Sequence, residues 1–192
     1  MTYLKKPRHP LPVRLLHWIY VPAILTLAWS GFYISNPTGR RGFGSMNSAR
    51  KTHFAAQFLF ISSYLCRLYY GTVNRNYKEI IPDQQAVKEL PRFLQYEFFL
   101  TKKKPRYKKY NPGQKFVFTG MALQWAVQII SGLGLYWPKA GQKINLPTGG
   151  LNPLRKMHYL NALFTLFLAG VHFYFVLTDD LAKLKSIFTG YE

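Results

Sequence analysis

Acidic side chains are scarce in this sequence, which has 7 Asp and Glu against 26 Lys and Arg in 192 residues. The formal net charge is therefore +19, and aromatic residues make up 17% of the chain. Many bases together with many aromatics are typical of two classes of protein, nucleic-acid binders and membrane proteins with basic cytoplasmic loops. Overall composition does not separate these classes, so the distribution of residues along the chain must decide.

Cysteine is nearly absent as well, because Cys66 is the only one. A lone cysteine excludes an internal disulfide and a metal site built from thiolates alone. We interpret Cys66, which lies in an apolar stretch, as a small buried residue. No cleavable signal peptide is expected, since the first apolar run is too long for a signal sequence and has no small-residue cleavage site near its end.

Acidic residues are missing altogether from four apolar segments, each about 20 residues long. These segments cover residues of about 13–34, 53–72, 116–137 and 157–177. A helix of this length crosses roughly 30 Å of hydrocarbon at about 1.5 Å per residue. Lipid does not tolerate unpaired backbone, and the segments do not alternate with a period of two. We therefore predict an all-α fold, an integral membrane four-helix bundle that forms a single domain over residues 1–192.

Basic residues are distributed unevenly between the two sides of this predicted bundle. The N-terminal segment, the long connection of about residues 73–115 and the C-terminal tail together carry 17 Lys and Arg, against 8 in the other two connections. The positive-inside rule then places both termini in the cytoplasm. We expect a multi-pass protein of the cytoplasmic membrane, in contact with lipid. Nucleic acid is not an expected partner, because topology explains the charge.

Four of the five histidines lie in the apolar segments, where an ionisable side chain is costly and usually functional. In the predicted topology, His17 and His172 lie toward the cytoplasmic face, whereas His53 and His158 lie toward the outer face. Two pairs of imidazoles are thus expected at two depths. The fifth, His9, lies in a basic segment between prolines and is interpreted as a surface residue.

The spacing within the last segment points to a specific cofactor. His158 and His172 are 14 residues apart, which places them within about 40° of the same helix face and roughly 21 Å apart along the axis. One helix face thus presents two imidazoles, one in each leaflet, as the shared wall of two haems would require. Iron with two axial histidines has no open position and transfers electrons without binding a substrate. We predict two haem b groups between the helices, with the four histidines as iron ligands.

Two other interpretations of the four histidines compete with haem. Histidines in membrane helices often form interhelical hydrogen bonds only, but such bonds would not by themselves produce the 14-residue spacing with partners at both depths. A metal-transport site would usually add carboxylates within the membrane, and the four segments contain none. The haem interpretation is favoured over both.

The residues around these histidines form recognisable motifs. They are Arg-Leu-Leu-His-Trp at residues 14–18, Arg-Lys-Thr-His at 50–53, Arg-Lys-Met-His at 155–158 and Val-His-Phe-Tyr at 171–174. With four helices and basic cytoplasmic ends, the pattern resembles the dihaem cytochrome b subunits of formate dehydrogenase, Ni/Fe hydrogenase and thiosulfate reductase over nearly the whole chain. The resemblance implies that His53 and His158 bind the outer haem and His17 and His172 the inner one, in agreement with their depths.

The resemblance also implies a quinone site beside the inner haem, near His172. Tyr-Asn-Pro-Gly-Gln-Lys at residues 110–115 is similar to the Tyr-Asn-Ala-Gly-Gln-Lys of formate dehydrogenase gamma subunits, with a proline in place of the small residue. Asn111 and Gln114 offer neutral hydrogen bonds to a quinone carbonyl, and Gly113 allows the ring to approach the backbone. An equally open interpretation is structural: Asn111 caps the start of the third helix and a proline follows it.

Two more residues are candidates for the haem environment. Arg67 lies 14 residues after His53, so it would face the inner haem, where it could pair with a propionate; it could instead extend to the cytoplasmic headgroups. Gly31 lies 14 residues after His17, on the face that would meet the outer haem, where a missing side chain would let the porphyrin approach. Close helix packing is the alternative role for Gly31.

The function predicted from these observations is membrane electron transfer. An iron–sulfur or multihaem subunit would dock on the outer, periplasmic face in a hetero-oligomer. Electrons would pass through both haems to or from menaquinone or ubiquinone, at a quinone site of the chain's own. Two alternatives remain: a haem-free anchor for a catalytic subunit, and a stand-alone quinol-oxidising carrier similar to cytochrome b561.

Overall fold

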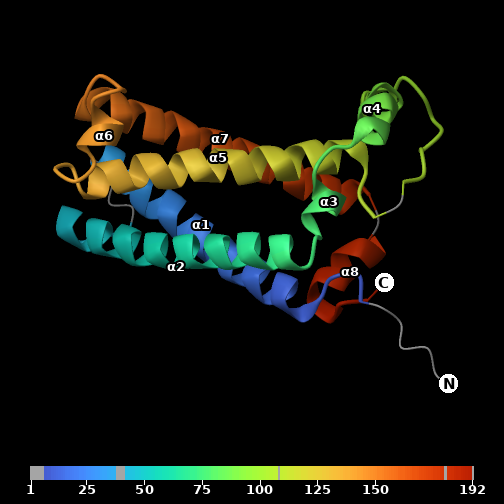
Figure 1. The fold of residues 1–192 in the computed structure, drawn as a ribbon, viewed down its shortest axis with the longest axis horizontal. Coiled ribbons are helices and arrows are strands. Elements are labelled where there is room, and N and C mark those ends of the chain that lie inside the picture. The colour runs from blue at the N-terminus through green and yellow to red at the C-terminus, as the bar shows by residue number, and fades with distance from the viewer. Residues whose placement is uncertain (1–6, 38–41, 108, 180, 192) are drawn as a thin grey trace. The chain divides into compact units, whose positions relative to one another are not determined.

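The computed structural model describes residues 7–37, 42–107, 109–179 and 181–191, and over these ranges it contains helices and no strands (Figure 1). The helices are α1 (Leu11–Ser35), α2 (Met46–Val73), α3 (Tyr77–Ile80), α4 (Gln84–Glu97), α5 (Pro112–Tyr136), α6 (Gln142–Asn145), α7 (Leu151–Thr178) and α8 (Leu181–Thr189). The bases Lys5, Lys6, Arg40, Arg41 and Lys108, which entered the prediction of orientation, lie outside the described ranges.

The four long helices contain most of the predicted apolar segments but begin earlier. The segments expected at 53–72 and 157–177 lie inside α2 and α7, which start at Met46 and Leu151. The third segment begins four residues earlier than expected, because Asn111 caps α5 and Pro112 occupies its first turn. Proline in the first turn likewise starts α1, since its missing N–H would have no partner there.

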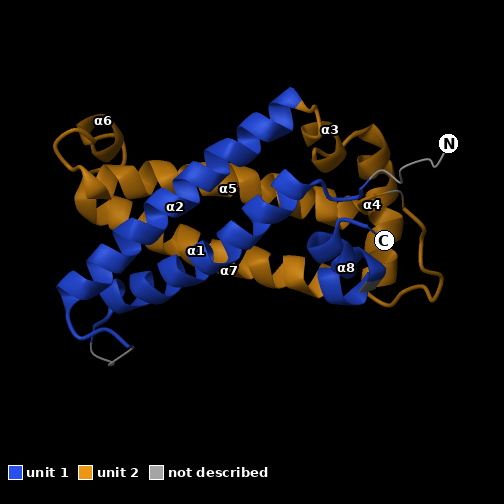
Figure 2. Cartoon of the chain, turned by 90° about the horizontal axis from the view of Figure 1, so that it is seen from below, with its two compact units in different colours: residues 1–73, 176–192 blue, residues 74–175 orange. Residues whose placement is uncertain are grey.

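Contacts within the chain cluster into two compact units (Figure 2). Unit 1 comprises residues 1–73 and 176–192 and holds α1, α2, the end of α7 and α8; unit 2 comprises residues 74–175 and holds α3 to α6 and most of α7. The organisation as one domain over residues 1–192 stays a prediction.

In unit 1, α1 and α2 form a hairpin with aromatic packing. The Tyr20 hydroxyl on α1 donates a hydrogen bond to the Ser63 carbonyl on α2 at 3.2 Å, and its ring meets Phe60 edge-on. Helix α8 folds against the start of α1, where Arg14 and Trp18 donate to the carbonyls of Phe188 and Ile187. These donors satisfy carbonyls at the end of α8 that have no partner within the helix.

In unit 2, α5 and α7 form a second, antiparallel hairpin joined by a turn that contains α6. Amide side chains link the two helices: Gln124 donates to the Asn161 carbonyl at 2.9 Å, and Asn161 donates to the Gln124 carbonyl at 3.2 Å. Asp83 caps α4 and forms an ion pair with Lys115 on α5 at 3.2 Å. The hydrogen bond from the Ala86 amide and the Lys115 ammonium lower the pKa of the Asp83 carboxyl below its usual value.

Three of the helices, α1, α5 and α7, are long and apolar enough to cross a membrane. Only 11% of the apolar stretch of α1 and 17% of those of α5 and α7 is buried inside the protein, so most of this apolar surface faces outward, as lipid contact requires. Helix α2 does not meet the same standard over its described residues, because charged and polar side chains dilute its apolar run. The expectation of a buried Cys66 is wrong, since this residue is exposed on α2.

Candidate functional site

His53 lies near the start of α2, and a serine on α1 holds its ring. The Nδ1 atom of His53 is 2.9 Å from the hydroxyl oxygen of Ser30. The single hydroxyl hydrogen of Ser30 is donated to the Thr26 carbonyl at 2.6 Å. The serine oxygen therefore accepts from His53, so Nδ1 carries the proton and Nε2 keeps the lone pair. This is the protonation state in which an imidazole binds a metal through Nε2.

Gly31 follows Ser30 and lies beside the same imidazole. A Cβ atom at Gly31 would lie 3.5 Å from Cε1 and 3.8 Å from Nδ1 of His53, which is ordinary van der Waals contact. The protein alone therefore has room for an alanine at this position. A strict need for glycine would arise only from a further group against this face of the ring.

His158 on α7 is held in the same way within unit 2. Its Nδ1 atom is 2.8 Å from the Ser131 hydroxyl oxygen on α5, and Ser131 donates its hydrogen to the Gln128 carbonyl at 3.1 Å. His158 therefore also carries its proton on Nδ1. Its Nε2 atom is 3.2 Å from the amide nitrogen of Gln128, whose oxygen accepts from Asn161 at 2.7 Å. The lone pair at Nε2 thus accepts from the glutamine.

The two hairpins present these histidines from matching sequence motifs. The first helix of each hairpin carries Ser-Gly, at residues 30–31 and 131–132. The second helix carries Arg-Lys-x-His, at residues 50–53 and 155–158. In both cases the serine holds the Nδ1 atom of the histidine. The two hairpins therefore repeat the same arrangement of motifs and the same serine–histidine contact. Sequence reasoning missed this repeat, although both motifs are visible in the sequence.

The other two predicted ligands have aromatic neighbours. His17 lies in the first half of α1, and its ring meets that of Trp18 edge-on with 5.1 Å between centroids. His172 lies on α7, where Phe118 of α5 approaches its ring edge-on at 5.5 Å and Tyr110 packs behind Phe118. Both imidazoles are only partly exposed.

The structure confirms that His158 and His172 lie on one uninterrupted helix, α7. Each predicted ligand pair takes one histidine from each compact unit, so both pairings stay predictions. Arg67 is partly buried on α2, and its role toward a propionate also stays a prediction.

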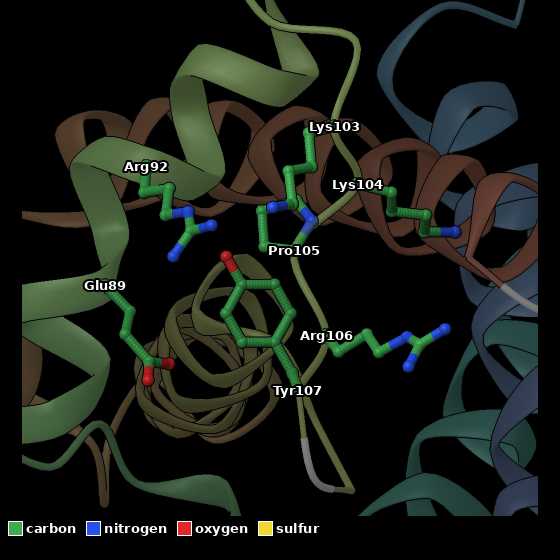
Figure 3. Close-up of a pocket in the computed structure, with 7 residues that line it drawn as sticks. All are labelled: Glu89, Arg92, Lys103, Lys104, Pro105, Arg106 and Tyr107. Carbon is green, nitrogen blue, oxygen red and sulfur yellow. The ribbon is translucent and has the colours of Figure 1, made fainter.

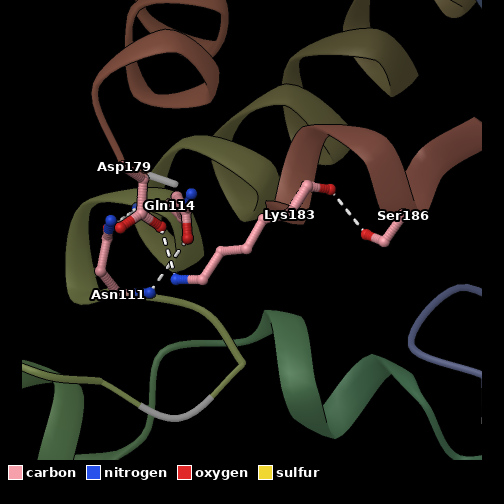
Figure 4. A network of polar contacts seen from close by, with 5 residues as sticks. All are labelled: Asn111, Gln114, Asp179, Lys183 and Ser186. Carbon is pink, nitrogen blue, oxygen red and sulfur yellow. Dashed lines mark hydrogen bonds and ion pairs between the residues drawn. The ribbon is translucent and has the colours of Figure 1, made fainter. Parts of the chain in front are cut away.

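The residues predicted to bind quinone are buried at the start of α5. Figure 4 shows Asn111 and Gln114 side by side. The side-chain oxygen of Asn111 accepts from the backbone N–H of Gln114 at 2.8 Å, and the side-chain oxygen of Gln114 accepts from the backbone N–H of Asn111 at 3.1 Å. These bonds form a capping box. A Cβ atom on Gly113 would lie 2.5 Å from the Phe93 ring and 2.9 Å from that of Phe175. Two rings of the chain itself thus use the space at Gly113, and the quinone role stays a prediction.

A family model described as prokaryotic cytochrome b561 matches residues 8–190. The chain belongs to the prokaryotic cytochrome b561 family. The superfamily resemblance inferred from the histidine motifs is thereby confirmed, and this cytochrome is a membrane protein of electron transport with apolar helices.

Similar proteins match it over most of its length. A protein of Cupriavidus necator, named a probable Ni/Fe-hydrogenase B-type cytochrome subunit, is 29% identical over 92% of this cytochrome and 80% of its own length. A Rhodobacter capsulatus protein of the same name is 27% identical over 92% of this chain and 75% of its own. One from Azotobacter vinelandii is 24% identical over 92% and 82%.

The family implies haem b, and the residues of this cytochrome fit that group. Two imidazoles hold their protons on Nδ1 through buried serines, which leaves Nε2 as the nitrogen that an iron would take. Noncovalent binding also fits, because a single cysteine cannot supply the two thioether bonds of a c-type haem.

Proposed function

We propose that this cytochrome carries two haem b groups and relays electrons across the membrane between a redox partner on the outer face and membrane quinone. His53 and His158 would bind the outer haem, and His17 and His172 the inner one. The observation that carries the proposal is the matched pair of serine-held imidazoles, one in each hairpin. If the histidines served only to link helices, nothing would require both His53 and His158 to carry the proton on Nδ1.

The residues of the chain would prepare the iron ligands before any electron moves. Ser30 and Ser131 accept the Nδ1 proton and keep each ring in one orientation. Hydrogen bonding at Nδ1 makes the opposite nitrogen a stronger donor. When bound, haem supplies an iron that alternates between ferric and ferrous forms and accepts one electron at a time.

Helix α7 would connect the two levels. It is continuous over 28 residues, and the 14-residue spacing of His158 and His172 corresponds to roughly 21 Å along its axis. This distance places one imidazole in each half of a hydrocarbon layer about 30 Å thick. The helix would thus set the separation of the two sites and align them along the membrane normal.

The proposed topology has four membrane spans, with α2 added to the three that meet the length and hydropathy standard. Residues 52–66 of α2 contain no charged side chain, and Arg67 follows them. This stretch would cover about 22 Å at 1.5 Å per residue, and the arginine would extend to the headgroups or to a propionate. With both termini cytoplasmic in the inner membrane, His53 lies near the outer surface.

The partner would dock at the two outer connections that the sequence predicts at residues 35–52 and 138–156. The names of the similar proteins point to a Ni/Fe hydrogenase as the partner complex. An iron–sulfur subunit of that complex would exchange electrons with the outer haem. A multihaem subunit is the other partner with suitable chemistry. At the inner level, bound quinone would lie beside Asn111, Gly113 and Gln114. At the outer level, Gly31 would give the porphyrin room to approach.

Haem content tests the ligand set. His158→Ala and His172→Ala are each expected to lower bound haem from two to one per chain, because each variant removes one of the two imidazoles that would hold that haem. A pyridine haemochrome assay on protein expressed with sufficient haem measures this, with His9→Ala as a control that keeps both. Two haems in either variant would contradict the pairing, and a wild-type chain without haem would favour the anchor interpretation.

Quinone turnover tests the inner site. Asn111→Ala is expected to slow quinone reduction or quinol oxidation at least tenfold while haem content stays at the wild-type level. Asn111→Ser provides the control, because serine retains the helix cap but not the amide. A serine variant with full turnover would show that Asn111 acts only as a cap.

A further inference from the structure

The connection between α2 and α5 contains an amphipathic helix that the electron-transfer function does not use. Helix α4 buries Ala86 and Phe93 toward the rest of unit 2. Its Phe93 ring meets Phe175 and Tyr107 edge-on, so the helix is fixed to the start of the second hairpin. An exposed apolar tip comes directly after α4, and a run of bases comes after the tip.

The apolar tip consists of Phe98, Phe99 and Leu100. Their side chains are 69%, 89% and 76% exposed, although large apolar residues are normally covered. Phe99 also has a φ of 59°, in the left-handed region where glycine or asparagine usually ends a helix. The backbone N–H groups of Phe99 and Leu100 donate to the carbonyls of Tyr96 and Gln95, so this conformation closes the end of α4 and leaves both side chains exposed.

A pocket lined mainly by bases lies between α4 and the segment that follows the tip along the chain. Figure 3 shows the lining: Arg92 and Glu89 from α4 face the segment 103–107, with the Tyr107 ring between them. The pocket has a volume of about 470 Å³, and its charged residues are Arg92, Lys103, Lys104 and Arg106 against the single carboxylate of Glu89. Burial, and then the charge of Glu89, raise the pKa of the Tyr107 hydroxyl, so it remains a neutral donor. The pocket therefore suits an anion.

The position along the chain places this pocket at the membrane surface. Tyr107 lies five residues before Pro112, where the apolar helix α5 begins. The ion pair of Asp83 with Lys115 and the contact of Phe93 with Gly113 tie α4 to the first turn of α5. A segment fixed to the end of a membrane span lies at the depth of the headgroups, where aromatic rings and bases are both favourable.

We propose that the tip at residues 98–100 and the bases Arg92, Lys103, Lys104 and Arg106 form a binding surface for anionic phospholipid. The phosphate of one headgroup enters the pocket, where Arg92 offers paired N–H donors and the lysines and Arg106 add positive charge around it. Phe98, Phe99 and Leu100 enter the boundary between headgroups and acyl chains. The proposal depends on α5 crossing the membrane and not on haem or quinone, so it can fail while the electron-transfer proposal holds.

Lipid retention tests the pocket. The full-length chain, purified in a mild detergent, is titrated with phosphatidylglycerol or phosphatidylcholine, and bound lipid is counted by native mass spectrometry. We expect tighter binding of phosphatidylglycerol. Lys103→Gln with Lys104→Gln should weaken it on the order of 25-fold, about fivefold for each base removed. The matched control, Lys139→Gln with Lys143→Gln, removes the same charge from another connection and should change binding less than twofold.

Three results would overturn the proposal in this experiment. One is equal binding of the two lipids by the wild-type chain. Another is an equal loss of lipid in the lysine pair and in its matched control. The third is displacement of phosphatidylglycerol by millimolar inorganic phosphate, because a site for free phosphate would gain nothing from an apolar tip.

The depth of the tip gives an independent measurement. Cys66→Ser supplies a background without cysteine, and Phe99→Cys in that background carries an environment-sensitive fluorophore. In nanodiscs containing phosphatidylglycerol we expect quenching by lipids spin-labelled near the headgroup and protection from aqueous iodide. The protection should decrease in the Lys103→Gln, Lys104→Gln background. A label that iodide reaches freely in nanodiscs would contradict the proposal.

Discussion

The two hairpins of this cytochrome hold a histidine through the same serine contact but differ at the other ring nitrogen. Each serine is followed by a glycine, and in the α1–α2 hairpin Gly31 leaves room for a methyl group beside Cε1 of His53. In the α5–α7 hairpin, the Gln128 amide lies 3.2 Å from Nε2 of His158. The comparison shows that two sequences with a common motif can prepare a ligand equally while only one of them keeps the binding nitrogen hydrogen bonded.

The two hairpins also differ in the kind of side chain that links their helices. Tyr20 and Phe60 pack the centre of the first hairpin with aromatic rings. The second uses a polar ladder instead: Gln124 donates to Asn161, and Asn161 donates to Gln128. Hydrogen bonds between buried amides favour one register of the two helices, because a shift would leave more of these groups unpaired. The second hairpin therefore has an alternative partner for His158 and polar links between its helices.

The largest effect should come from filling the space beside His53. Gly31→Leu is expected to remove one of two haems, because the side chain would occupy the face that the porphyrin needs, whereas Gly31→Ala should lower occupancy only partly. Haem content per chain is the measurement, and the thermal midpoint of unfolding shows whether packing suffers. Gly120→Leu on α5 is the matched control, since a Cβ atom there meets nothing within 4 Å. Equal haem loss in both variants would favour a packing role for Gly31.

A smaller effect should follow from removing the competing amide at His158. Gln128→Ala is expected to tighten haem binding at this site about fivefold, because one hydrogen bond no longer has to break. Titration of the apo-protein with haem measures the change. Gln124→Ala also removes an amide that links α5 to α7 but does not touch His158, so its affinity should stay near the wild-type value. An unchanged affinity in Gln128→Ala would show that the amide is displaced without cost.

The smallest effect should come from the serines, and it should be similar in the two hairpins. Ser30→Ala and Ser131→Ala are each expected to raise the reduction potential of the outer haem by up to about 60 mV. Loss of the Nδ1 hydrogen bond weakens electron donation to ferric iron. A redox titration followed by absorbance measures the shift, and a threonine at either position should restore it. Identical potentials in the alanine variants would mean that the serines position the rings without tuning the iron.

The sequence alone predicted much of the candidate site. Lengths and hydropathy located the four long helices, and the 14-residue spacing placed two histidines on one face of α7. The partners of those histidines did not follow from the sequence, because Ser30 and Ser131 are 23 and 27 residues away and meet their targets only through helix packing. The contact of Gln128 with His158 was not predicted for the same reason. The short helix α4 was missed because its periodicity is confined to 14 residues inside a basic connection.

The class of molecule follows from the order of residues alone. Long runs without carboxylates must satisfy their backbone within a helix, and histidines placed in those runs at one-face spacing have few other uses. The packing of helices alone determined which serine accepts each Nδ1 proton, that Gln128 contacts the nitrogen of one histidine, and that two phenylalanine rings lie against Gly113. These contacts depend on the register between neighbouring helices, and register is set by many side chains at once.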